Sequence, residues 1–127
     1  SKEAEAGSTV KLLARSLVAG WESAEPTPQK KKLVSFPAVP KDVPRGTTYA
    51  STRADWSAWA PLRFEIELPQ RYQYEIDAAK DGKSANVVAR GDLDGDGKPS
   101  EFRMHVEVGR SGALEVSPSL VEINPDE

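Results

Sequence analysis

The stretch that decides the fold is FRMHVEV, residues 102–108, in which apolar and polar side chains alternate. A period of two places the apolar side chains on one face of a β-strand and the polar side chains on the other. Strands of this kind are typical of an antiparallel sheet with one buried and one solvated face. We therefore predict an antiparallel sheet in this half of the chain.

Three earlier stretches alternate in the same way, namely residues 62–68, 72–76 and 85–89. Turns are indicated by Asp81-Gly82 and by the GRSG stretch at residues 109–112. The apolar residues beyond the second turn are Leu114, Val116, Leu120, Val121 and Ile123. We expect residues 61–127 to form a sheet of about four strands and a tail.

An amphipathic helix is predicted for residues 1–21. Its apolar residues recur at steps of three and four, which places them on one face of a helix. These residues are Ala6, Val10, Leu13, Leu17 and Trp21. Gly20 indicates the end of the helix. The first turns carry only alanine on the apolar stripe, as expected if the helix continued upstream before Ser1.

Residues 22–60 are predicted to form a long loop, because prolines interrupt any helix or central strand there. These prolines are Pro26, Pro28, Pro37, Pro40 and Pro44. Apolar side chains are expected to pack this loop against the rest of the protein, so that the loop is ordered. They are Val34, Phe36, Val39, Val43, Tyr49, Trp56 and Trp59. The order helix, loop, strands predicts one α+β domain over residues 1–127, with the helix covering the apolar face of the sheet.

Composition narrows the classes of function. The 127 residues are 38% hydrophobic and 29% charged, which is the balance of a globular domain. The net charge of −3 provides no basic surplus for nucleic acid or anionic lipid. Without cysteine, the chain has no disulfide, thiolate metal site or cysteine nucleophile. No stretch approaches the ~20 apolar residues of a membrane span, so we expect this segment to be soluble.

The sharpest local motif is GDLDGDG, residues 91–97. Carboxylates at alternate positions, with glycines that allow a tight curl, can direct several oxygens at one centre, as calcium requires. The motif matches the first half of an EF-hand loop, but the twelfth position holds Arg103 instead of a glutamate; a different loop geometry could recruit Ser100, Glu101 or a backbone carbonyl instead. The alternative is a turn without an ion. The candidate calcium ligands are Asp92, Asp94 and Asp96.

Catalysis is not expected. His105, the single histidine, falls on the polar side of a predicted strand and has no metal-binding or nucleophile pattern around it. The acidic pairs Glu65 with Glu67 and Glu75 with Asp77 fall on the solvated side of predicted strands, where pKa values are hardly perturbed. The aromatic residues that could form a sugar or peptide platform are interpreted as core residues instead. They are Trp56, Trp59, Tyr72 and Tyr74.

Several segments resemble type IV pilins and the pseudopilins of type II secretion. SKEAEA at residues 1–6, followed by VKLL at 10–13, resembles the second half of their long N-terminal helix. WAPL at residues 59–62, YQY at 72–74 and the stretch 89–97 resemble the C-terminal sheet of pilin-like proteins that carry a GDLDGDG loop. The ending INPDE at residues 123–127 resembles their tail. The stretch 22–52 is unmatched, and the leader, the apolar half-helix and the cysteine-bounded C-terminal region of the family are absent.

The resemblance implies a structural subunit of a helical filament, here as its soluble, N-terminally truncated part. A preceding apolar half-helix would anchor the precursor in the bacterial inner membrane, with the head in the periplasm, and then pack in a cell-surface filament. Its partners would be other pilin subunits and the pilus assembly machinery. The residues expected near the subunit interface are Glu3, Glu5, Lys11 and Arg15. The family's calcium-binding pseudopilins agree with an ion in the aspartate loop.

Major pilin, minor pilin and secretion pseudopilin are not separated, and neither are motility, adhesion, DNA uptake and secretion. The alternative function is a calcium-stabilised extracellular binding or adhesion module unrelated to pili. That alternative explains the aspartate loop but not the alanine-rich opening of the helix.

Overall fold

The fold is taken from a computed structural model, which describes residues 2–23 and 32–124. Within these residues the chain forms one α-helix, one 3-10 helix and six strands. They are α1 (Lys2–Ser23), β1 (Phe36–Val39), η1 (Arg53–Leu62), β2 (Gln73–Ala78), β3 (Ser84–Gly91), β4 (Ser100–Val108), β5 (Leu114–Val116) and β6 (Val121–Ile123). Neither described helix has the length and apolar composition of a membrane span.

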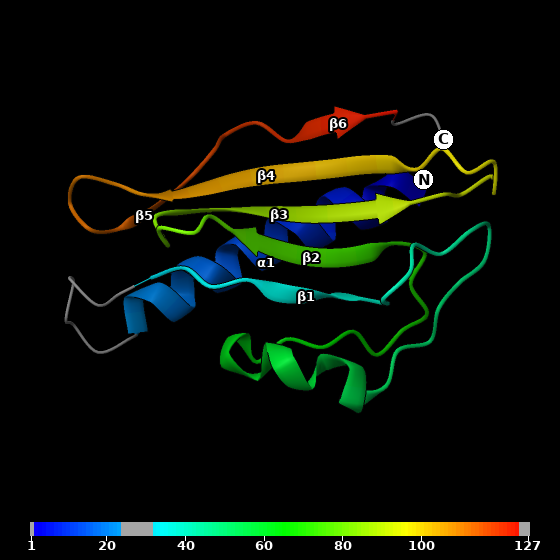
Figure 1. The fold of residues 1–127 in the computed structure, drawn as a ribbon, viewed down its shortest axis with the longest axis horizontal. Helices are drawn as coiled ribbons and strands as arrows, with labels where there is room; N and C mark the ends of the chain where they lie inside the picture. Colours follow the sequence, from blue (N-terminus) through cyan, green and yellow to red (C-terminus); the bar gives the residue numbers. More distant parts are fainter. Residues whose placement is uncertain (1, 24–31, 125–127) are drawn as a thin grey trace.

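The strands form one antiparallel sheet in the order β1-β2-β3-β4-β5, and β6 pairs with β4 beside β5 (Figure 1). The register brings the predicted apolar positions together, with Ile76 opposite Val87 and Val87 opposite Met104. The predicted α+β class and the strands at 72–76, 85–89 and 102–108 are confirmed, but the sheet has six strands where about four were predicted, because β1 comes from the predicted loop and β6 from the predicted tail.

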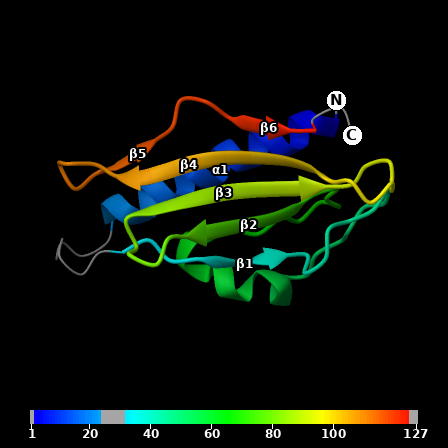
Figure 2. The same ribbon diagram turned by 45° about the horizontal axis from the view of Figure 1, so that its top comes forward.

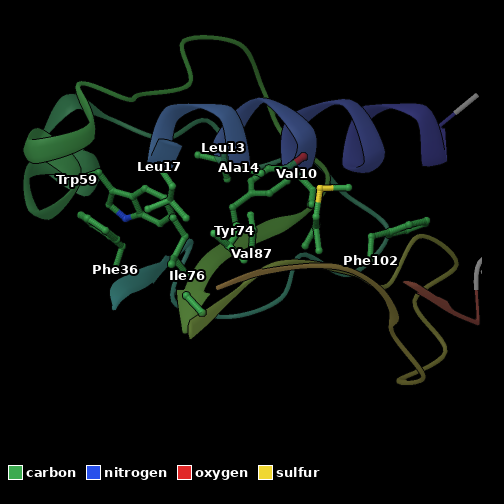
Figure 3. Close-up of a cluster of buried hydrophobic side chains, with 14 of the residues drawn as sticks. Val10, Leu13, Ala14, Leu17, Phe36, Trp59, Tyr74, Ile76, Val87 and Phe102 are labelled. Carbon is green, nitrogen blue, oxygen red and sulfur yellow. The ribbon is translucent and has the colours of Figure 1, made fainter. Parts of the chain in front are cut away.

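α1 runs along one face of this sheet, behind β3 and β4 in Figure 2. The predicted apolar stripe faces the strands, and each of its residues is buried. The exposed fractions are 0% for Ala6, Val10 and Leu13, 5% for Leu17 and 8% for Trp21. Figure 3 shows the resulting layer of side chains, with Trp59 at one end and Phe102 at the other. Burial of apolar surface between helix and sheet is the main force that holds these two layers together.

Two boundaries differ from the prediction. α1 ends at Ser23, two residues beyond the predicted end, so Gly20 lies inside the helix and does not end it. Residues 62–68 do not form a strand, although their apolar and polar residues alternate. Both edges of β2 are already paired, with β1 and β3, so residues 62–68 cannot add a strand beside β2. The alternation reflects a segment that lies along the core with Phe64 and Ile66 partly buried.

The predicted loop at 22–60 also contains regular structure. β1 pairs with β2 and brings Phe36 opposite Ile76. Pro37 is tolerated because β1 is an edge strand, where a missing N–H breaks no ladder. η1 closes the core beside β1, with Trp56 and Trp59 buried. Residues 24–31 of the predicted loop lie outside the described residues. In the described part, most of the expected anchoring side chains are buried or partly buried, but Val34 is 57% exposed and does not anchor the segment.

Candidate functional site

The aspartate loop joins β3 to β4, and the structure brings its three carboxylates together. One ligand oxygen from each of Asp92, Asp94 and Asp96 lies within 4.8 Å of the others. Asp92 is buried, with 2% of its surface exposed, whereas Asp94 and Asp96 are exposed. The loop curls tightly because Gly95 and Gly97 adopt positive φ angles of 71° and 85°, which favour glycine.

Asp92 is held by groups of the protein itself. Its Oδ2 accepts a hydrogen bond from Gly97 N–H at 2.8 Å, and its Oδ1 accepts one from Asp96 N–H at 3.1 Å. The Arg45 guanidinium lies 3.4 Å from the same Oδ2 and is 66% exposed. An ion at this loop would therefore share Asp92 with a positive charge. Calcium takes six to eight oxygen ligands, so carbonyl groups or water would have to complete the shell.

The two further ligands considered from the sequence are directed elsewhere. Ser100 is buried, and its hydroxyl donates to the Gly91 carbonyl at 3.2 Å. Glu101 is bound by two arginines on the solvated face of the sheet, Arg90 and Arg103. Burial raises the pKa of Glu101, but the hydrogen bonds from Arg103 and Arg90 outweigh it and lower the pKa overall. Glu101 is therefore an ion-pair residue of the sheet and not part of the loop cluster.

The four predicted interface residues lie on α1 in three different situations. Lys11 and Arg15 are exposed, one helical turn apart. Glu5 is partly buried, because its carboxylate accepts hydrogen bonds from the Arg71 backbone N–H at 3.0 Å and from the Tyr74 hydroxyl at 3.2 Å. The side chain of Glu3 lies outside the described residues. Leu12, which the prediction omitted, is 47% exposed beside Lys11.

His105 and the four aromatic residues have the structural roles predicted for them from the sequence. His105 is exposed on β4, 3.1 Å from the Asn86 amide oxygen and 3.7 Å from the Glu107 carboxylate. The four aromatic residues considered as a platform are core residues, with exposed fractions of 3% or less. They are Trp56, Trp59, Tyr72 and Tyr74.

The paired carboxylates do not form an acid–base pair. Glu75 binds Arg90 at 2.7 Å, and Glu65 lies 3.8 Å from Arg53. Glu65 and Glu67 also lie outside any strand, contrary to the prediction, for the reason given for residues 62–68. The pairs of Glu75 with Arg90 and of Glu65 with Arg53 are surface ion pairs, which contribute little to stability.

Compared with known proteins, the chain matches no protein-family model, no curated protein and no solved structure.

Proposed function

We propose that this chain is a structural subunit of a type IV pilus or pseudopilus filament. The observation that carries the proposal is the placement of α1 across the sheet. One face of the helix is buried, while Lys11, Leu12 and Arg15 stay exposed on the other face. A helix of this kind can pack against the sheet of its own chain and also present a surface to neighbouring subunits. The resemblance of both ends of the chain to pilins supports the same proposal.

In this proposal, α1 continues an apolar half-helix that the resemblance places before it. That half-helix would hold the precursor in the bacterial inner membrane and later pack with its neighbours in the filament. Each head would contact the next through different surfaces, and such heterologous contacts build open helical assemblies. Because Glu5 is engaged within its own chain, Lys11, Leu12 and Arg15 are the better candidates for the contact between subunits.

The test is a cross-linking experiment on the complete open reading frame, expressed in a bacterium with a filament assembly system. The sequence contains no cysteine, so Leu12→Cys introduces a single thiol into this segment. Neighbouring subunits in sheared filaments are expected to cross-link through Cys at this site. Lys80→Cys, at an exposed position in the turn between β2 and β3, is the matched control and is expected to stay monomeric. Absence of the protein from both the inner membrane and the sheared filaments would end the proposal.

A second candidate function is a calcium-stabilised extracellular binding or adhesion module unrelated to pili. It rests on the three carboxylates whose oxygens lie within 4.8 Å of one another. An ion that binds only the folded state raises the free energy of unfolding by mass action. Melting is therefore expected at higher temperature in millimolar calcium than in a chelator, and the double variant D94N/D96N should lose the difference. Identical melting curves would remove calcium from the proposal.

A further inference from the structure

A solvent-open hollow of about 460 Å³ lies along η1 and the residues that follow it. Ala60 and Phe64 provide apolar surface, to which Trp56 adds little because it is 3% exposed, while Arg53 and Arg63 provide two positive charges. Glu65 provides one negative charge. The hollow thus combines apolar contact with a local excess of positive charge, in a chain whose net charge is −3.

The wall of this hollow is held in place by contacts of η1 with neighbouring segments. The indole of Trp59 donates to the Pro37 carbonyl at 2.9 Å, and the indole of Trp56 donates to the Ser51 hydroxyl at 2.8 Å. Trp56 also packs edge-on against Phe64, with ring centroids 5.4 Å apart. A preformed site loses little conformational entropy when a ligand binds.

Both arginines of the hollow are available to an anion. Arg53 is 90% exposed on its side chain and lies 3.8 Å from Glu65, at the long end of ion-pair distances. Such an exposed pair is weak and exchanges readily with other partners. Arg63 takes part in no ion pair with the residues that the structure describes.

Arg63 also has an unusual backbone conformation. It ends η1 in the left-handed region, with φ 52° and ψ 40°. Helix ends of this geometry favour glycine, because any other side chain is strained there. Strained residues of this kind occur at functional sites, where the side chain serves a purpose that outweighs the strain. Arg63 is one such residue, and its side chain lines the hollow.

We propose that this hollow binds an acidic peptide segment of a partner protein, in which a carboxylate adjoins an aromatic or aliphatic side chain. The apolar part would lie against Ala60 and Phe64, and the carboxylate would bind the guanidinium of Arg63 or Arg53. A bidentate arginine–carboxylate pair supplies both strength and orientation. Glu65 and the net negative charge disfavour a dense polyanion such as nucleic acid. This site goes beyond the filament proposal and does not depend on it.

The first experiment compares two blocked dipeptides, acetyl-Phe-Asp-amide and acetyl-Phe-Asn-amide, by NMR titration of the ¹⁵N-labelled protein. The aspartyl peptide is expected to shift the Arg63 and Phe64 amides and the Trp56 indole, and to bind ~10-fold more tightly than the asparaginyl peptide. Inorganic phosphate is the third probe and is expected to bind weakly, because it offers no apolar part. Equal binding of the two peptides, equally tight binding of phosphate, or no shift at about 10 mM peptide would each overturn the proposal.

The second experiment separates binding from folding. R63G removes the guanidinium and also relieves the left-handed strain, so its urea midpoint is expected to rise while aspartyl-peptide binding weakens ~10-fold. R53Q is expected to weaken binding without a loss of stability, and R110Q, at an exposed position in the turn between β4 and β5, is the matched control with unchanged binding. Wild-type affinity in both R63G and R53Q would show that the arginines have no part in binding.

Discussion

The carboxylate of Glu5 accepts a hydrogen bond from the backbone N–H of Arg71 at 3.0 Å, which fastens α1 to the segment entering β2. The same carboxylate lies 3.5 Å from the Arg71 guanidinium and accepts a hydrogen bond from the Tyr74 hydroxyl. Burial raises the pKa of Tyr74, so this hydroxyl stays protonated and remains a donor. Glu5 therefore joins α1 to the sheet through polar contacts with Arg71 and Tyr74.

Glu5→Ala is expected to lower the free energy of unfolding by about 1–2 kcal/mol, because it leaves the Arg71 N–H without its carboxylate acceptor. Urea unfolding followed by circular dichroism measures the change. Lys11→Ala, at an exposed position on the same helix, is the control and is expected to stay within about 0.5 kcal/mol of wild type. Equal stabilities of the two variants would mean that the Glu5 contacts contribute nothing net.

The solvated face of the sheet predicts a dependence of stability on acid. The pKa of Glu101 is lowered from its ordinary value of 4.5, with the hydrogen bonds from Arg103 and Arg90 outweighing the effect of burial. A carboxyl whose folded-state pKa is depressed contributes stability above its unfolded value, and that contribution is lost as the pH falls through the folded value. Stability should therefore decrease below about pH 4.5.

Glu101→Gln tests that assignment, because an amide does not titrate. Urea unfolding between neutral pH and pH ~3 should show a smaller loss of stability for this variant than for wild type. Glu67→Gln, at an exposed position outside the strands, should leave the pH dependence unchanged. If both variants lose stability as steeply as wild type, other carboxylates cause the acid sensitivity.

Arg45 is expected to oppose any ion at the aspartate loop. Its guanidinium lies 3.4 Å from Asp92 Oδ2 but is 66% exposed, so the pair contributes less than about 1 kcal/mol to stability. Arg45→Gln should therefore barely change melting in a chelator, while calcium should raise the melting temperature more than in wild type. Isothermal titration with calcium measures the same effect directly. A weaker calcium response in this variant would show that Arg45 does not compete with the ion.

The sheet and the helix could be predicted because each produces a repeating burial pattern along the sequence. Residues 72–76, 85–89 and 102–108 alternate and form strands, and the helical stripe is buried as expected. Residues 62–68 show the limit of this reasoning. Alternation reports which side of a segment is buried, whereas a strand also needs a partner with an unpaired edge. β1, in contrast, is a strand without alternation. It was missed because its four residues, which include Pro37, carry almost no periodic signal.

Candidate sites could likewise be predicted where residues close in the sequence form them, but not where distant residues come together. The grouping of Asp92, Asp94 and Asp96 follows from neighbouring positions and was predicted. Contacts between distant parts of the chain were not, because no local pattern encodes them. Arg45 beside Asp92 and Glu5 beside Arg71 are separated by 47 and 66 positions.

Gly91 is a position where the sequence shows only a glycine and the structure shows why. A Cβ there would lie 2.6 Å from a ring carbon of Tyr72 and 3.3 Å from the Arg71 carbonyl oxygen. Tyr72 is fully buried and packs edge-on against Phe102, with ring centroids 5.8 Å apart, so the ring has little room to move. Gly91→Ala should lower the free energy of unfolding by about 1–3 kcal/mol through overpacking, as measured by urea unfolding.

Gly20 provides the matched substitution with the opposite sign. It lies inside α1, and a Cβ there would meet only a Leu62 methyl at 3.7 Å, an ordinary van der Waals contact. Alanine favours the helix over glycine, because glycine loses more backbone entropy on folding. Gly20→Ala should therefore raise the free energy of unfolding by about 0.5–1 kcal/mol. A loss of stability in Gly20→Ala similar to that in Gly91→Ala would mean that α1 packs against η1 more closely than this distance indicates.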